Sequence, residues 1–340
     1  LGNLAAIEES EWVGTMLGRR VRDGGGYTSG GRVIRDMALI IETEYARDEA
    51  PRRVWDDFSP PDFDYVNRYS GGAKVNNQDV WDLTSEDFIL NTVRGYYEFY
   101  SRRVQANNPD PYYSAAAALC WTDSSQHGRQ QATENARMSG RVDPVRIKKQ
   151  SFYAFQTMQS QEPAIYLVGH WNYPSDPNTY VYGLRDPVTH QYTGETALRD
   201  ATNKTIYVIA SEHVSKVELW INGNFAGEDN LARDGFIYEF PGINIMQPGY
   251  IEAIGYSPFG EELVRHRIET VDDVVGIRLT PITGPDGLRA DGSDIAFVDV
   301  EVVDAYGRVH PLDYERIDFE IKGPAVFLGG YNSGVKDLRH

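Results

Sequence analysis

Two continuous apolar runs mark the first half of the chain. Residues 37–41 (MALII) run into a polar, charged segment, and residues 114–121 run into the polar segment 122–125. Runs of this length are typical of strands buried on both faces, as in a parallel sheet. Between them, apolar residues recur every three or four positions from residue 89 to 104, and Asp87 completes a capping box with Thr84, so a helix is predicted from Thr84 or Ser85. This order indicates a βαβ unit.

From about residue 164 the polar and apolar positions alternate with a period of two. Six short strands are predicted there, and Asn222–Gly223 is a hairpin turn signal. Six strands at this spacing favour a β-sandwich, and a second set predicts the start of another one. The first set covers residues 164–170, 205–210, 216–222, 236–240, 250–256 and 263–269, and the second covers 275–279, 295–303 and 319–328.

Composition changes near residue 160 and divides the chain into three parts. We expect an α/β part at residues 1–160, a complete sandwich at 161–272 and a truncated second sandwich at 273–340. A chain of 340 residues with 41% hydrophobic residues is long enough for two or three domains. Residue 1 is Leu and the last segment stops before a closing strand, so we expect a fragment, a proteolytic product or a subunit that does not fold alone.

Charge and cysteine content exclude several classes of protein. The chain has 50 acidic against 33 basic residues and a net charge of −17, which argues against a nucleic-acid partner. Its apolar runs are far shorter than the roughly 20 residues of a membrane-spanning helix. The single cysteine, Cys120, excludes a disulfide framework and a multi-cysteine zinc site, and no metal site is predicted.

The best candidate for chemistry is Glu44, at the end of the first apolar strand. The C-terminal tip of a strand is where (β/α)8 barrels hold catalytic groups, and a pair of carboxylates can perform retaining glycoside hydrolysis. Glu42 is a rival, because alternation places both glutamates on the same face of a regular strand. A surface glutamate at a strand end is the alternative to either role.

The motif IIETEYA at residues 40–46 resembles strand 7 of glycoside hydrolase family 2, in which the glutamate before tyrosine is the nucleophile. Matched residue by residue, Glu44 takes that role and Glu42 does not. The motif ALCWTD at 118–123 resembles strand 8 of the family, where a tryptophan, here Trp121, forms the floor of the sugar subsite. The segments 122–129 and 139–143 (SGRVD) are similar to β-galactosidase-like members, and 168–172, 217–223 and 279–292 resemble their accessory β-domains.

This resemblance implies an α/β plus all-β fold, namely the C-terminal part of a (β/α)8 TIM barrel followed by immunoglobulin-like β-sandwich domains. It implies a retaining exo-β-glycosidase that acts on carbohydrate, with β-galactosidase as the first expectation. A β-glucuronidase or another β-glycosidase of the family is one alternative, and a non-catalytic carbohydrate-binding or scaffold protein is another. No cofactor is required, and a structural cation near the site is left open.

One position departs from the β-galactosidase pattern. Three residues after the nucleophile those enzymes carry a histidine, whereas this chain has Arg47. A guanidinium group binds carboxylates through two parallel hydrogen bonds, so Arg47 is a candidate for recognising an anionic sugar such as a uronic acid. Pairing of Arg47 with Asp48, Asp56 or Asp57 is the alternative.

The remaining site candidates have two interpretations each. Asp123 and His127 either hydrogen-bond a sugar hydroxyl or organise the loop after the second strand, and Trp121 is either a sugar platform or a core residue. The family's acid/base glutamate follows an asparagine, and no Asn–Glu pair occurs in the chain. We therefore expect a partner polypeptide with the N-terminal part of the enzyme, including the acid/base and barrel strands 1–6. Homo-oligomerisation is left open.

Overall fold

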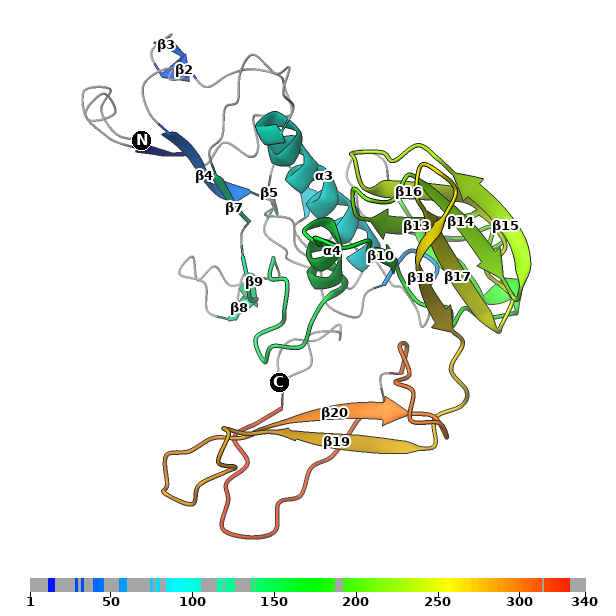
Figure 1. Cartoon of the computed structure of the whole chain (residues 1–340). Helices are drawn as coiled ribbons and strands as arrows, with labels where there is room; N and C mark the ends of the chain where they lie inside the picture. The colour runs from blue at the N-terminus through cyan, green and yellow to red at the C-terminus, as the bar shows by residue number, and fades with distance from the viewer. Residues whose placement is uncertain are drawn as a thin grey trace.

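A computed structural model describes residues 12–15, 28–29, 32–33, 39–45, 55–59, 74–75, 78–79, 84–104, 115–118, 120–125, 136–137, 139–186, 192–313 and 315–330. Figure 1 shows a short parallel sheet, two helices beside it, a β-sandwich and a separate β-hairpin near the C-terminus. Among the described residues, no helix is both long enough and apolar enough to cross a membrane.

The N-terminal sheet is parallel and has β4 (Leu39–Tyr45) at its centre. On either side lie β1 (Trp12–Thr15) and β7 (Ala115–Ala118). Helix α3 (Ser85–Val104) connects β4 to β7, which confirms the predicted βαβ unit. Strand β1 is not predicted from the sequence, because four residues are too few for a periodic signal. Two-residue strands complete this region, namely β2 (Thr28–Ser29), β3 (Arg32–Val33), β5 (Lys74–Val75), β6 (Gln78–Asp79), β8 (Ser124–Ser125) and β9 (Ala136–Arg137).

Helix α3 begins with the predicted capping box. The backbone N–H of Asp87 donates to Thr84 Oγ1 at 2.9 Å, and the backbone N–H of Thr84 donates to Asp87 Oδ2 at 3.2 Å. Glu86 and Asp87 place negative charge in the first turn, where the helix dipole favours it. The side chain of Thr84 therefore fixes where the helix starts. A second helix, α4 (Gln150–Met158), leads into the sandwich.

The sandwich consists of two antiparallel sheets. One has the order β10-β13-β16 and the other β15-β14-β17-β18, and all six predicted strands are present, the first one shortened. The hairpin β11–β12 and strand β15 are additional. The bounds are β10 (Ile165–Leu167), η2 (Pro177–Thr179), β11 (Val181–Arg185), β12 (Tyr192–Leu198), β13 (Lys204–Ala210), β14 (Lys216–Ile221), β15 (Asn224–Asp229), β16 (Ile237–Ile243), β17 (Tyr250–Tyr256) and β18 (Glu262–Glu269).

The predicted Asn222–Gly223 turn joins β14 to β15. Asn222 has φ 51° and Gly223 has φ 79°, the left-handed conformations that a two-residue type I′ hairpin requires. The side chain of Asn222 also accepts the backbone N–H of Tyr250 at 2.8 Å and donates to the carbonyl of Pro248 at 3.0 Å. The turn thus sets the register of β14 and β15 and is tied to β17.

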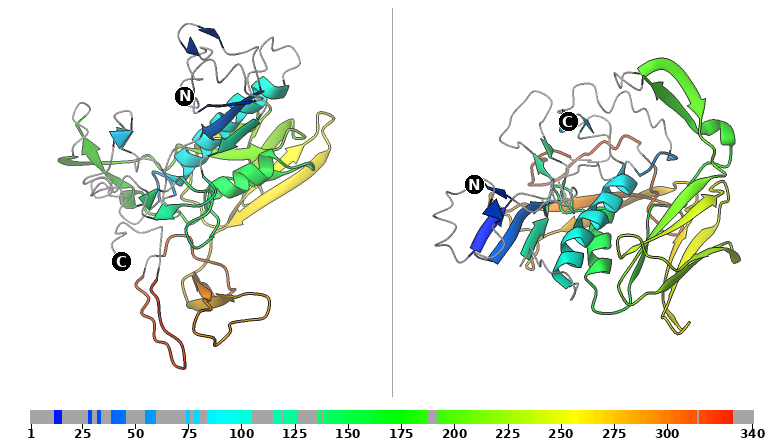
Figure 2. Two further views of the ribbon diagram at one scale, coloured as in Figure 1. Left: turned by 90° about the vertical axis from the view of Figure 1, so that its left-hand side faces the viewer. Right: turned by 90° about the horizontal axis from the view of Figure 1, so that it is seen from above.

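Strand β13 contributes to two hydrophobic cores. Its residues Ile206, Val208 and Ala210 face the other sheet of the sandwich, and the alternate residue Ile209 packs with the helices. This second core contains Ile89, Leu90 and Val93 of α3, Ala154 and Met158 of α4, and Val168, Phe236 and Ile237 of the sandwich. Figure 2 shows both helices lying alongside the sandwich. The sheet β10-β13-β16 is therefore covered on both faces.

The C-terminal region contains the antiparallel pair β19 (Gly276–Ile282) and β20 (Phe297–Val303), as predicted. The predicted strand at residues 319–328 is wrong, because these residues form no strand. Gly323 has φ 123° and Pro324 carries no backbone N–H, so the segment bends there instead of extending. The rings of Phe319 and Phe327 stack on each other with centroids 5.5 Å apart.

Candidate functional site

The candidate site lies where β4 and β7 end. The strands are parallel, with Tyr45 opposite Ala118, so the chain leaves the sheet on the same side after both. Glu42 pairs with Ala116, and the next pair is Tyr45 with Ala118. Between these two pairs β4 advances by three residues and β7 by only two. The extra residue makes a bulge at Thr43–Glu44, across which strict alternation does not hold. Arg47 and His127 lie outside the described residues.

Trp121 follows β7 and belongs to neither hydrophobic core. Its side chain is 61% exposed, and its ring meets the ring of Phe152 edge-on with centroids 5.7 Å apart. An exposed indole can accept a sugar ring, whose C–H groups favour aromatic contact. Within the part of the chain that the structure describes, Trp121 is thus a mostly exposed residue, and its role as a sugar platform stays a prediction.

The backbone around Trp121 is held by the SGRVD segment, residues 139–143. Trp121 O accepts the N–H of Val142 at 3.0 Å, and the N–H of Asp123 donates to Val142 O at 2.9 Å. Gly140 packs so closely that a Cβ atom there would lie 2.1 Å from the backbone nitrogen of Asp123. Only glycine fits at this position, which gives the motif a physical reason: it supports the loop that carries Trp121.

Asp123 is buried beneath this loop. Its Oδ1 accepts the Lys149 ammonium at 2.7 Å and the Gly140 N–H at 2.8 Å, while Oδ2 has no hydrogen-bond partner in the described part of the chain. Burial raises the pKa of Asp123 to about 6, although the ammonium of Lys149 opposes the shift. Of the two roles considered for Asp123, these contacts favour organisation of the loop over hydrogen bonding to a sugar.

Arg141 ties the same loop to the helices. Its guanidinium lies 5.1 Å from the ring centroid of Phe88 in α3 and 5.0 Å from that of Phe155 in α4, and it donates to Ser139 O at 2.7 Å. Sequence reasoning did not identify Gly140, Arg141 or Lys149 individually. The signal that could have found them is the concentration of charged and small residues between 139 and 149.

A second polar cluster anchors the segment 55–59, which follows β4 in the chain. The buried Asp56 accepts Tyr173 OH at 2.5 Å and Ser59 Oγ at 2.8 Å, and its Oδ2 lies 3.4 Å from Lys204 Nζ. The same ammonium lies 2.9 Å from Glu86 Oε2 at the start of α3. This cluster, named the Lys204 cluster below, joins the segment, the helix and β13.

The pKa values of the groups in and beside the Lys204 cluster are set by their burial and by the positive charge of the Lys204 ammonium. Burial alone would raise the pKa of Asp56, but the Lys204 ammonium and the hydrogen bonds hold it at about 2. Burial raises the pKa of Glu86 to about 7 against the same ammonium. Burial lowers the pKa of His170 to about 4, and its Nδ1 accepts the N–H of Asn172 at 3.0 Å, which requires a neutral ring.

Within the residues the structure describes, no group of three or more His, Cys, Asp and Glu side chains could hold a metal ion. Cys120 Sγ lies 3.2 Å from Thr122 O and 3.4 Å from Ser139 Oγ. The single cysteine therefore contributes to the loop around Trp121.

Comparisons with known proteins agree on one family. Residues 279–340 match the family model of glycoside hydrolase family 2 C-terminal domain 5. A β-glucuronidase of Formosa agariphila is 36% identical over 295 residues, which cover 87% of this chain and 26% of the relative. A β-galactosidase of Bacteroides ovatus is 26% identical over 195 residues, 57% of this chain and 19% of that protein.

Among solved structures, a family 2 β-glucuronidase is similar with a TM-score of 0.67 and 34% sequence identity. The match covers 88% of this chain and 27% of that one. The chain thus spans about a quarter of the length of the curated and the solved β-glucuronidase that it matches.

Proposed function

The chain matches the C-terminal portion of glycoside hydrolase family 2 proteins, and from this premise we propose that the protein containing it is a retaining β-glucuronidase. The observation that carries the proposal is the 36% identity to a β-glucuronidase over 87% of the chain. The β-galactosidase relative is less similar, at 26% identity over 57% of the chain. β-Glucuronidase, an alternative at the level of sequence, therefore replaces β-galactosidase as the first choice.

In this proposal Glu44 is the nucleophile. Its carboxylate attacks the anomeric carbon, the bond to the leaving-group oxygen breaks, and a glycosyl-enzyme ester forms. An acid/base carboxyl outside this chain protonates the leaving oxygen and then removes a proton from the water that opens the ester. The bulge at Thr43–Glu44 supports the choice of Glu44 over Glu42, because such irregularities occur beside active sites and redirect a side chain.

Recognition of the sugar is assigned to Trp121 and Arg47. The exposed indole supports a role as a platform under the ring. Arg47 is proposed to bind the carboxylate of the uronic acid. Two of the three acidic partners considered for Arg47 have other cations beside them, since Asp56 faces Lys204 and Asp57 lies 3.3 Å from Arg199, which supports a role of Arg47 toward the substrate. The third, Asp48, lies outside the described residues.

The test is hydrolysis of p-nitrophenyl β-glucuronide and β-galactoside by the full polypeptide. We expect preference for the glucuronide, and equal or faster hydrolysis of the galactoside would overturn the assignment. Glu44→Gln should remove nearly all hydrolysis and leave binding intact, whereas the matched control Glu42→Gln should retain most activity. Unaltered hydrolysis by Glu44→Gln would end the nucleophile assignment.

A further inference from the structure

A continuous row of aromatic contacts leads away from Trp121. Its ring meets Phe152 at 5.7 Å, and Phe152 meets Tyr153 at 5.6 Å, both edge-on. Tyr153 stacks on Tyr166 with centroids 5.4 Å apart, and Tyr166 stacks on His266, also at 5.4 Å. The row starts after β7, crosses the first turn of α4 and ends on β18. It therefore connects the proposed sugar platform to the sandwich.

The row ends in a cleft. This cleft has a volume of about 750 Å³, large enough for a short oligosaccharide segment, and it lies between α4, β10, β18 and the linker after β18. Tyr153, Tyr166 and His266 line it, together with the polar side chains of Gln156 and Asn172. Tyr153 is 37% exposed, so part of its ring is open to a ligand.

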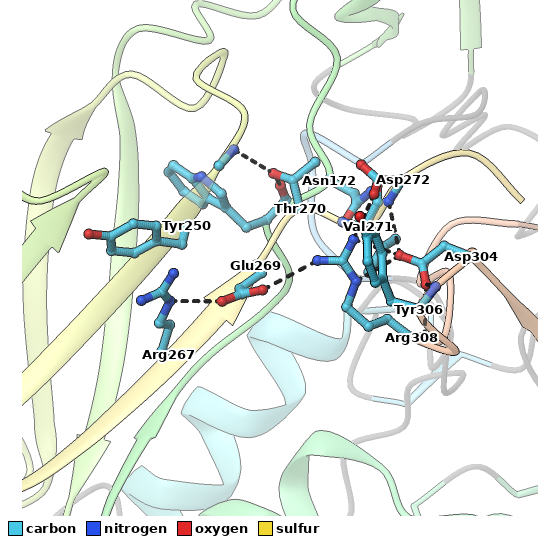
Figure 3. Close-up of polar contacts among 12 residues, drawn as sticks. Asn172, Tyr250, Arg267, Glu269, Thr270, Val271, Asp272, Asp304, Tyr306 and Arg308 are labelled. Carbon is cyan, nitrogen blue, oxygen red and sulfur yellow. Dashed lines mark hydrogen bonds and ion pairs between the residues drawn. The ribbon is translucent and has the colours of Figure 1, made fainter.

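Polar contacts gather at the end of the cleft that is formed by the linker after β18, and Figure 3 shows them. Asn172 Nδ2 donates to Val271 O and Asn172 Oδ1 accepts the N–H of Val271, both at 3.1 Å. Arg308 lies 3.3 Å from Glu269 and 2.7 Å from Asp304. These contacts join the sandwich to the segment after β20. The cleft is consequently preformed, which lowers the entropic cost of binding a ligand.

One N–H group of the lining is left to bind a ligand. His266 Nδ1 accepts the backbone N–H of Leu167 at 2.9 Å, so the proton of the neutral ring is on Nε2, which donates to no described residue. This N–H can donate to a hydroxyl oxygen.

Lys148 adds a positive charge along the row. Its ammonium lies 4.5 Å from the ring centroid of Phe152 and 5.7 Å from that of Tyr153. The residue is exposed and forms no ion pair with any described residue. In a chain with net charge −17, a lysine that pairs with no acidic side chain of the described residues and lies beside two aromatic rings is suited to an anionic group of a ligand.

We propose that the row beyond Trp121, from Phe152 to His266, and the cleft at its end bind an acidic oligosaccharide, as a site that adjoins but does not include the residues assigned to the cleaved sugar. The proposal rests on the proposed function in that the protein acts on carbohydrate. Tyr153 stacks on the C–H face of one sugar, Lys148 meets a carboxylate, and the Nε2–H of His266 donates to a hydroxyl deeper in the cleft.

The test is calorimetric titration of the full polypeptide with a hyaluronan hexasaccharide whose non-reducing end is N-acetylglucosamine, which an exo-acting β-glucuronidase cannot open. The neutral comparison is chitohexaose. Tyr153→Ala should weaken binding of the hyaluronan hexasaccharide about tenfold, corresponding to about 1.4 kcal/mol. Lys148→Met should weaken it about fivefold and leave chitohexaose binding unchanged. The matched control Phe259→Ala, an 89% exposed aromatic in the turn before β18, should change neither.

The outcomes separate this proposal from the proposed function. Both variants should hydrolyse p-nitrophenyl β-glucuronide at the wild-type rate, because a single sugar does not reach the cleft. Binding without hydrolysis by the wild type would support the oligosaccharide site and count against the proposed function alone. No binding of the hexasaccharide, equal loss in Phe259→Ala, or equally tight binding of chitohexaose would overturn the acidic-oligosaccharide site.

Discussion

Replacing Lys204 by methionine tests the buried cluster that anchors the segment after β4. The ammonium is 2% exposed and lies 2.9 Å from Glu86 and 3.4 Å from Asp56. Methionine keeps most of the side-chain volume but leaves two carboxylates buried without a cation. Removal of one partner from a buried ion pair costs about 3–5 kcal/mol, so we expect a loss of that size at pH 7.5.

The loss of stability caused by Lys204→Met should be smaller at acidic pH. In the wild type the pKa of Asp56 is about 2, below its ordinary value, so its stabilisation is present above about pH 4 and lost as the pH falls toward 2. Without Lys204 the pKa of Asp56 rises above that of the unfolded chain, and the pKa of Glu86, already raised to about 7 by burial, rises further. The folded variant then binds protons that the unfolded variant does not, and its deficit against the wild type falls between pH 7.5 and 5.

Hydrogen–deuterium exchange of the full polypeptide measures this effect, because peptides from β13 and α3 report their own free energies of opening. The matched control is Lys216→Met, which breaks the half-exposed pair with Glu218 at 2.7 Å and should cost less than about 1 kcal/mol. The reasoning is refuted if Lys204→Met costs no more than Lys216→Met, or if its cost is the same at both pH values.

Three further changes test individual contacts. Gly140→Ala should destabilise the protein by about 1–3 kcal/mol and reduce glucuronide hydrolysis, since its Cβ would lie 2.1 Å from a backbone nitrogen; wild-type melting and kinetics would contradict this. His170 has a pKa of about 4, below the ordinary 6.5, so the stability of the wild type should fall by about 3 kcal/mol as the pH is lowered from 6.5 to below 4. Thermal melts should show that His170→Gln lacks this loss. Tyr173→Phe removes a hydrogen bond to the Asp56 carboxylate and should cost about 1.5–3 kcal/mol in urea unfolding, whereas Tyr182→Phe should cost little.

Local signals in the sequence predicted local structure well. The contacts that define the capping box of Thr84 and Asp87 and the Asn222–Gly223 turn lie within a few residues, so a short stretch of sequence is enough to predict them. The six sandwich strands could be predicted because polar and apolar residues alternate along them, and the apolar residues fill the core between the two sheets. Residues 319–328 have the composition of a strand but no neighbouring strand to pair with among the described residues, and Gly323–Pro324 bends the segment.

The candidate site was predictable only in part. The positions of Glu44 and Trp121 at the ends of two neighbouring strands could be predicted from motifs, because each motif is contained in the end of a single strand. The Lys204 cluster could not, because Asp56, Glu86 and Lys204 come from three distant segments that only the packing of α3 on the sandwich brings together. Arg47 remains a prediction, and so do the roles of Glu44 and Trp121 in catalysis.

The double coverage of the sheet β10-β13-β16 has a consequence for how the protein can be divided. A cut at residue 160, where the composition changes, would separate Ala154 and Met158 from Ile209 and Phe236, which pack in one core. An excised sandwich would therefore expose to solvent the hydrophobic surface that packs against the helices, and it would self-associate. The helices and the sandwich should unfold as one cooperative unit. Limited proteolysis should therefore leave the junction near residue 160 intact and cut first in connecting segments that do not pack in a hydrophobic core.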